Sequence, residues 1–243
     1  MKIFICDGTC DSFFTAVFDA YRLSECAITS DSEIQLTLGC EVIKVETNLE
    51  KSGRVQTGIK KYDLSAVDDV VTVLRSCDRS KEMTAFEYIK LLLKQRSPVK
   101  NAFNIPAVIE FNDLLYKVTG EAHQMKGFLR FMESKNGAFY APYSPDNNIT
   151  DLLMPHFAER FKSEKFVIHD LKRKLAGMYD GEKWIMGYAG EAEIYLSEYE
   201  QAIEALWKRY YAAVNITERP HDKQMKRSMP VRYWKFLPEK APD

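Results

Sequence analysis

The spacing of the apolar residues changes at Gly127, and this change constrains the fold more than any other feature of the sequence. Before it, six apolar residues recur at intervals of three and four: Val108, Phe111, Leu115, Val118, Ala122 and Met125. This spacing predicts one long amphipathic helix that begins at Pro106. After it, short apolar runs alternate with turn pairs, which is typical of β-hairpins.

Two hairpins are predicted after Gly127, each centred on a polar residue followed by glycine. The paired segments are 128–131 with 138–141 around Asn136-Gly137, and 175–179 with 184–188 around Asp180-Gly181. Between the hairpins, the pattern predicts a helix over 149–161 and a buried strand over 166–168. A last long helix is expected from the stripe Leu196, Tyr199, Ile203, Leu206, Tyr210 and Val214.

The first third of the chain has a different pattern. Residues 2–6 predict a strand, Asp7-Gly8 a tight turn, and Thr9 or Asp11 the cap of a helix. Extended chain is expected over residues 33–47 because apolar and polar residues alternate there.

A shift in composition near residue 80 predicts two domains, residues 1–79 and residues 80–243. Because hairpins and helices alternate without a regular βαβ rhythm, the predicted class is α+β. We expect a mainly antiparallel sheet built from hairpins with flanking helices, preceded by a smaller α/β part.

The composition is that of a soluble globular protein, with 46% hydrophobic and 28% charged residues. The 34 Lys and Arg residues nearly balance the 35 Asp and Glu residues, so any nucleic-acid site must be a local basic patch. The sequence has no apolar run of the ~18 residues that a membrane span needs. Asp7 and Gly8 interrupt the first apolar run before a signal peptide can form, so we expect a cytoplasmic protein.

The five cysteines are scattered: Cys6, Cys10, Cys26, Cys40 and Cys77. Only Cys6 and Cys10 are close in sequence, and no second cluster accompanies them, so they are interpreted as small buried residues. The sequence contains no P-loop, no nucleophile elbow and no dinucleotide-binding glycine motif. We therefore expect neither a metal nor a cofactor.

One candidate site lies where the long helix meets the first hairpin, with His123 followed by Lys126 and Arg130 on either side of Gly127. Glycine lets a backbone approach a ligand closely, so the two cations are candidates for contacts with phosphate or DNA. The alternative is a helix end with favourable cations and a glycine cap, and capping rules favour it.

A second candidate is the pair His156 and Arg160, which the helical period places on one face with Leu153 and Phe157. A charge on an apolar face needs a partner. That partner is either a carboxylate of the fold or an anionic ligand such as phosphate, and the sequence leaves both open.

Two further segments carry polar groups. Residues 141–148 form a loop with two prolines and an Asp-Asn-Asn run, which caps the next helix or holds a substrate group. His169 and Asp170 end a strand and precede Arg173. Neighbouring strand residues point to opposite faces, so adjacency alone does not make these two a catalytic dyad.

The tail over residues 217–240 carries seven Lys and Arg residues against three acids, interleaved with aromatic residues. Arg232 and Trp234 are its candidate DNA contacts, because cations meet phosphates and aromatic rings stack on bases. The alternative is a tail that docks by its aromatic residues and exposes its basic edge to solvent.

Several stretches in this order resemble a known family: HQMKGFLRF, GAFYAPYSPDNNI, HFAERF, FVIHDLKRKLAGMYD and MPVRYWKFLPE. The chain resembles a bacterial family assigned to DNA repair or DNA metabolism, whose C-terminal part is a domain of unknown function. The resemblance covers residues 80–243 well. The opening FICDGTCDSFFTAVFDAY is similar to the family's start, where glycine more usually occupies the position of Ser12.

The resemblance implies partners. Members of the family are typically encoded beside a radical-SAM protein linked to DNA repair, and some are fused to a uracil-DNA-glycosylase-like domain. This chain lacks the cysteine triplet of a radical-SAM enzyme, and we expect no appended glycosylase-like domain. The resemblance therefore implies a stand-alone accessory whose partners are DNA and the radical-SAM protein.

Three hypotheses follow. The first is a DNA-associated accessory that uses the cations named above. The second is an enzyme acting on a nucleotide or damaged base, with catalytic groups among His123, His156, His169 and Asp170. In this hypothesis Arg130 or Arg160 holds the phosphate. The third is an adaptor that binds the radical-SAM protein and does not contact DNA.

Overall fold

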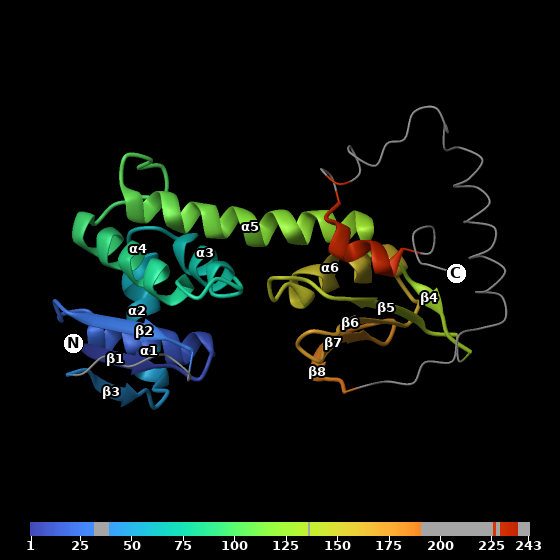
Figure 1. Cartoon of the computed structure of the whole chain (residues 1–243), viewed down its shortest axis with the longest axis horizontal. Coiled ribbons are helices and arrows are strands. Elements are labelled where there is room, and N and C mark those ends of the chain that lie inside the picture. Colours follow the sequence, from blue (N-terminus) through green and yellow to red (C-terminus); the bar gives the residue numbers. More distant parts are fainter. Residues whose placement is uncertain (32–38, 136, 191–225, 227–228, 238–243) are drawn as a thin grey trace. The chain divides into compact units, whose positions relative to one another are not determined.

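A computed structural model describes residues 1–31, 39–135, 137–190, 226 and 229–237 of the chain. Its contacts divide the chain into two compact units, Met1–Thr119 (unit 1) and Gly120–Asp243 (unit 2). Each unit is described by itself (Figure 1). The predicted helix over 196–214 and the first part of the extended segment predicted over 33–47 lie outside the described residues.

Unit 1 opens with the predicted strand, turn and helix. A parallel three-stranded sheet has the order β2-β1-β3, formed by β1 (Lys2–Ile5), β2 (Cys26–Thr29) and β3 (Glu41–Lys44). Helix α1 (Cys10–Ala20) follows β1, and Oγ1 of Thr9 accepts the backbone N–H of Ser12 at 3.2 Å. Thr9, rather than Asp11, is therefore the cap.

The helices that complete unit 1 bury its core. They are α2 (Leu49–Lys60), α3 (Ala66–Val73), α4 (Lys81–Gln95) and the first part of α5 (Pro106–Phe128). Figure 1 shows α3 and α4 between the sheet and the first part of α5. Buried aromatic residues from α1, α4 and α5, among them Phe14, Phe86 and Phe111, fill the space between the layers.

Unit 2 is built on a five-stranded sheet with the order β4-β5-β6-β7-β8. Its strands are β4 (Met132–Glu133), β5 (Phe139–Tyr143), β6 (Phe166–Asp170), β7 (Leu175–Tyr179) and β8 (Trp184–Tyr188). All pairs are antiparallel except β5 with β6, because helix α6 (Thr150–Phe161) connects these two strands as a crossover. The predicted α+β class and the mainly antiparallel sheet are confirmed.

The predicted hairpins are both present, with one correction. The second hairpin has the predicted strands, paired from Leu175 with Tyr188 to Tyr179 with Trp184. In the first, the strand predicted over 128–131 is wrong, because α5 continues to Phe128 and β4 contains only Met132 and Glu133.

The boundary between the two compact units falls within α5. The domain boundary predicted near residue 80 lies inside unit 1, between α3 and α4. It stays a prediction, because units defined by contacts do not test where a family domain begins. Among the described residues, no helix is both long enough and apolar enough to span a membrane.

Candidate functional site

A buried glutamate of α5 holds the loop between β5 and α6 in unit 2. Glu121 is 7% exposed. Its carboxylate accepts the backbone N–H groups of Asp146 and Asn147, both at 2.9 Å, and the Asn147 side-chain amide at 2.7 Å. Buried carboxylates of this kind are stable only when such donors surround them.

The C-terminal segment closes one side of this loop. The short 3₁₀ helix η1 (Val231–Phe236) buries Tyr233, whose hydroxyl donates to Glu121. The neighbouring Arg232 places Nη2 2.5 Å from Oδ2 of Asp146 and 3.7 Å from Oε1 of Glu121. Burial raises the pKa of Tyr233, and the hydrogen bond to the glutamate raises it further, so the phenol remains a donor at neutral pH.

An aspartate–arginine pair closes the other side. Asp170 is fully buried, and its Oδ2 lies 2.8 Å from Nη1 of Arg173. The same guanidinium donates to the backbone carbonyls of Pro145, at 3.2 Å, and of Asp146. The other oxygen of Asp170 accepts the backbone N–H groups of Lys172 and Arg173.

The structure thus brings three of the predicted residues, Asp170, Arg173 and Arg232, together around the loop at Asp146. Every one of them already has a partner inside the protein. We call this arrangement of Glu121, Asp146, Asn147, Asp170, Arg173, Arg232 and Tyr233 the loop clamp. Because each charge of the loop clamp is matched by an opposite charge or by hydrogen-bond donors within the protein, the arrangement is suited to stabilising the loop.

The three predicted histidines have separate surroundings. His169 is buried, with Nδ1 2.8 Å from the hydroxyl of Tyr140 and Nε2 3.3 Å from the carbonyl oxygen of Ala189. His156 is half-buried with its ring 5.0 Å from that of Phe157, and His123 is exposed on α5. No two of these histidines contact each other in the described structure.

The remaining predicted cations lie near helix ends. The guanidinium of Arg130 donates to the carbonyl oxygen of Gly127 at 3.1 Å, which agrees with the interpretation of a helix end with favourable cations. The glycine cap in that interpretation is wrong, because Gly127 lies inside α5 and has no positive φ. Lys126 is half-buried in the last turn of α5.

The expectation that Arg160 shares a buried face with His156 is wrong, because Arg160 is exposed in the last turn of α6. Trp234 donates from Nε1 to the carbonyl oxygen of Met229.

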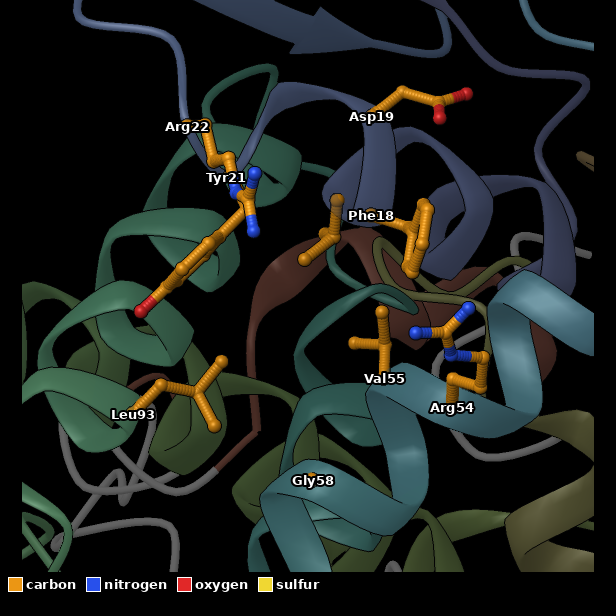
Figure 2. Close-up of a pocket in the computed structure, with 9 residues that line it drawn as sticks. Phe18, Asp19, Tyr21, Arg22, Arg54, Val55, Gly58 and Leu93 are labelled. Carbon is orange, nitrogen blue, oxygen red and sulfur yellow. The ribbon is translucent and has the colours of Figure 1, made fainter.

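Sequence reasoning missed a surface feature of unit 1. A hollow of about 590 Å³ is lined by residues of α1, α2 and α4 and of the turn after α1. Figure 2 shows Phe18 above Val55, with the guanidinium of Arg54 beneath the Phe18 ring, and Tyr21 extending beside Arg22 toward Leu93. The Arg54 guanidinium carbon lies 5.0 Å from the centre of the Phe18 ring, a cation–π contact.

A second hollow, also of about 590 Å³, adjoins the first and shares Tyr21 and Leu93 with it. We call the two together the unit 1 groove. Five cations line it: Arg22, Arg54, Lys90, Lys94 and Arg96. Two acids line it as well, Asp19 and Glu87.

The two acids of the groove are already paired. Asp19 lies 2.7 Å from Nζ of Lys51, and Glu87 lies 3.6 Å from Nζ of Lys90. The other four cations form no ion pair with a carboxylate of the described residues: Arg22, Arg54, Lys94 and Arg96. The groove is therefore an electropositive surface with aromatic side chains, which is suited to a ligand that carries phosphate.

One sequence signal pointed toward the groove. Lys90 and Lys94 are four residues apart on α4, so they share a helix face, and Leu93 lies beside them. The signal was insufficient because Arg22 and Arg54 come from distant parts of the sequence and join that face only in the folded unit.

The fold and its two polar sites define a two-unit protein, with a parallel α/β unit bearing an open cationic groove and an α+β unit with a closed clamp. Residues 79–239 match a family model described as a domain of unknown function (DUF4130), and the chain belongs to this family. The matched residues include α4, with its part of the groove, and all of the loop clamp. No curated protein matches the chain.

Proposed function

We propose that the protein is a nucleic-acid-associated accessory in DNA repair or DNA metabolism, and that the unit 1 groove contacts the phosphate backbone. The observation that carries this proposal is the set of groove cations without a carboxylate partner: Arg22, Arg54, Lys94 and Arg96. In a protein with a net charge of −1, such a set is a local electropositive patch rather than part of a general basic surface.

Binding of phosphate by unpaired cations is favourable because it releases the counterions that surround a nucleic acid. A cation that is already neutralised by a carboxylate gains less, since binding must compete with the existing pair. For this reason the groove is the better candidate than Arg173 or Arg232, which the loop clamp holds against acids.

The resemblance to DNA-repair and DNA-metabolism proteins supports DNA as the nucleic acid. The same resemblance supports the radical-SAM protein as a partner, with this chain as the component that contacts DNA. Co-purification of the two proteins from cells that carry both genes tests the partnership. Association of the two proteins without any DNA binding would favour the adaptor hypothesis instead.

DNA binding is tested by gel shift at low salt with single-stranded, duplex and uracil-containing DNA. The double variant Arg54→Gln/Arg96→Gln removes one unpaired cation from each hollow. We expect its affinity to fall about tenfold or more. If both cations meet phosphates, the slope of log affinity against log salt should fall by about 1.4 for single-stranded DNA and by about 1.8 for duplex DNA.

The matched control is Lys60→Gln/Arg79→Gln, which removes two exposed cations of unit 1 that line neither hollow. Its affinity should stay within twofold of that of the unaltered protein. Absence of binding to every DNA at low salt would overturn the proposed function. Equal losses in the two double variants would overturn the assignment of the groove.

A further inference from the structure

We propose that the unit 1 groove binds a single strand of DNA, with one base stacked on Tyr21 and the flanking phosphates held by cations of the two hollows. This inference rests on the proposed function and adds to it the form of the DNA. Three separate observations support it: the position of Tyr21, the distribution of the cations and the size of the hollows.

Tyr21 is the aromatic side chain that both hollows share. It follows the last residue of α1, and it is 39% exposed. Its ring makes no ring-to-ring or cation–π contact with another described residue, whereas the Phe18 ring already has Arg54 and Lys51 over it. A partly exposed tyrosine ring that lines a groove is a stacking platform for a base.

Cations without a carboxylate partner line both of the hollows that Tyr21 shares. One hollow supplies Arg22 and Arg54, and the other supplies Lys94 and Arg96. A DNA strand places a phosphate on each side of every base, so a strand with one base on Tyr21 brings a phosphate toward each hollow. The two acids of the groove do not oppose this, because Lys51 and Lys90 neutralise them.

The size of each hollow, about 590 Å³, lies within the range of about 300–1,000 Å³ that is typical of small-ligand sites. Each hollow therefore has the volume for a nucleotide unit. In a duplex, both faces of an internal base are covered by its neighbours, and its edge is paired. Stacking on Tyr21 thus requires an unpaired strand, and the groove should prefer single-stranded to double-stranded DNA.

The experiment measures fluorescence anisotropy with a labelled 15-nucleotide thymidine oligomer and with a 15-base-pair duplex at low salt. The unaltered protein should bind the single strand more tightly. Tyr21→Ala should weaken single-strand binding by roughly 5- to 150-fold, the loss expected when one stacked base is removed, and should leave duplex binding within twofold. Tyr21→Phe, which keeps the aromatic face, should retain most of the affinity.

Tyr116→Ala is the matched control, because Tyr116 is a highly exposed tyrosine of unit 1, at 76%, that does not line the groove. It should change neither affinity. Circular dichroism of each variant checks that unit 1 remains folded.

The outcomes separate the two proposals. Equal affinity for both DNAs, with Tyr21→Ala and Tyr21→Phe alike unchanged, would overturn the stacking inference while the proposed function stands. Loss of binding in the Arg54→Gln/Arg96→Gln variant, together with normal binding by Tyr21→Ala, would likewise overturn the stacking inference and leave the proposed function standing. Absence of binding to either DNA would overturn both.

Discussion

The arginines of the two units differ in what lies beside them. In unit 2, Arg173 and Arg232 face Asp170, Asp146 and Glu121 at ion-pair distance. In unit 1, Arg22, Arg54 and Arg96 line an open groove without such a partner among the described residues. The presence of an arginine therefore does not by itself indicate a binding site. Its charge stabilises the fold where an acid lies beside it and remains available to a ligand where none does.

The difference also concerns burial. Two of the three carboxylates of the loop clamp are buried, at 0% exposed for Asp170 and 7% for Glu121, and a buried carboxylate without donors is strongly unfavourable. Substitution in the clamp should therefore lower stability, and substitution in the groove should lower affinity for DNA. The following predictions are ordered from the largest expected change in free energy to the smallest.

Asp170→Asn should have the largest effect. The change leaves the half-buried guanidinium of Arg173 without its charged partner, and breaking a buried pair in this way costs about 3–5 kcal/mol. We expect faster hydrogen exchange of the amides of β6 and α6 and a lower urea midpoint. Glu164→Gln, at an exposed acid in the same unit, is the control and should leave both unchanged.

The opposite result would break the comparison between the units. If Asp170→Asn left the exchange rates unchanged but weakened DNA binding, the Asp170–Arg173 pair would be part of a binding or catalytic site, as the sequence-based hypothesis of an enzyme requires. Asp170 is one of the catalytic candidates proposed from the sequence, so this variant tests that prediction directly.

Glu121→Gln should have the next largest effect. The substitution replaces the carboxylate that accepts two backbone N–H groups and the hydroxyl of Tyr233 with a neutral amide. Hydrogen bonds to a charged group contribute about 1.5–3 kcal/mol. We expect unit 2 to be destabilised by that amount, with increased proteolysis after residue 229 as η1 separates from the loop. Gln124→Ala, at an exposed position of the same helix, is the control.

Intact η1 in Glu121→Gln, shown by unchanged proteolysis, would mean that the buried side chains of Met229, Tyr233 and Leu237 hold the segment without the carboxylate. The clamp would then be dispensable for docking, and the contrast with the unit 1 groove would rest on Asp170 and Arg173 alone.

Elements that depend on local signals could be predicted from the sequence. The hairpin of β7 and β8 follows from Asp180-Gly181 between two alternating runs, and Gly181 has the positive φ of 104° that its turn requires. Helix α5 follows from six apolar residues at helical spacing. Helix α2 was not predicted, because it contains two glycines and buries only Val55 and Ile59 among its apolar residues.

The polar sites could not be predicted, because their members are distant in sequence. Glu121 meets Asn147 across 26 residues and Tyr233 across 112 residues, and no spacing rule joins them. The loop itself was recognised from its two prolines, but its partners depend on how the units fold. Nor does any sequence pattern show which arginines will pair with a carboxylate in the folded protein. The comparison between the units depends on this pairing.

The buried tyrosines extend the comparison to uncharged groups. In unit 2, the hydroxyl of Tyr143 lies 2.8 Å from Oγ1 of Thr150, whereas in unit 1 the buried hydroxyl of Tyr88 has no hydrogen-bond partner among the described residues. Burial raises the pKa of both phenols, so both hydroxyl groups stay protonated at neutral pH.

Tyr88→Phe should therefore stabilise unit 1 by about 1 kcal/mol, because it removes an unsatisfied polar atom and keeps the ring stacked on Phe111 at 3.8 Å. Tyr143→Phe, the matched variant, should destabilise unit 2 by about 1 kcal/mol, since Thr150 loses its partner. Thermal unfolding followed by hydrogen exchange in each unit measures both. If Tyr88→Phe were destabilising as well, the hydroxyl would have a partner such as a buried water, and the two units would satisfy their buried polar groups equally.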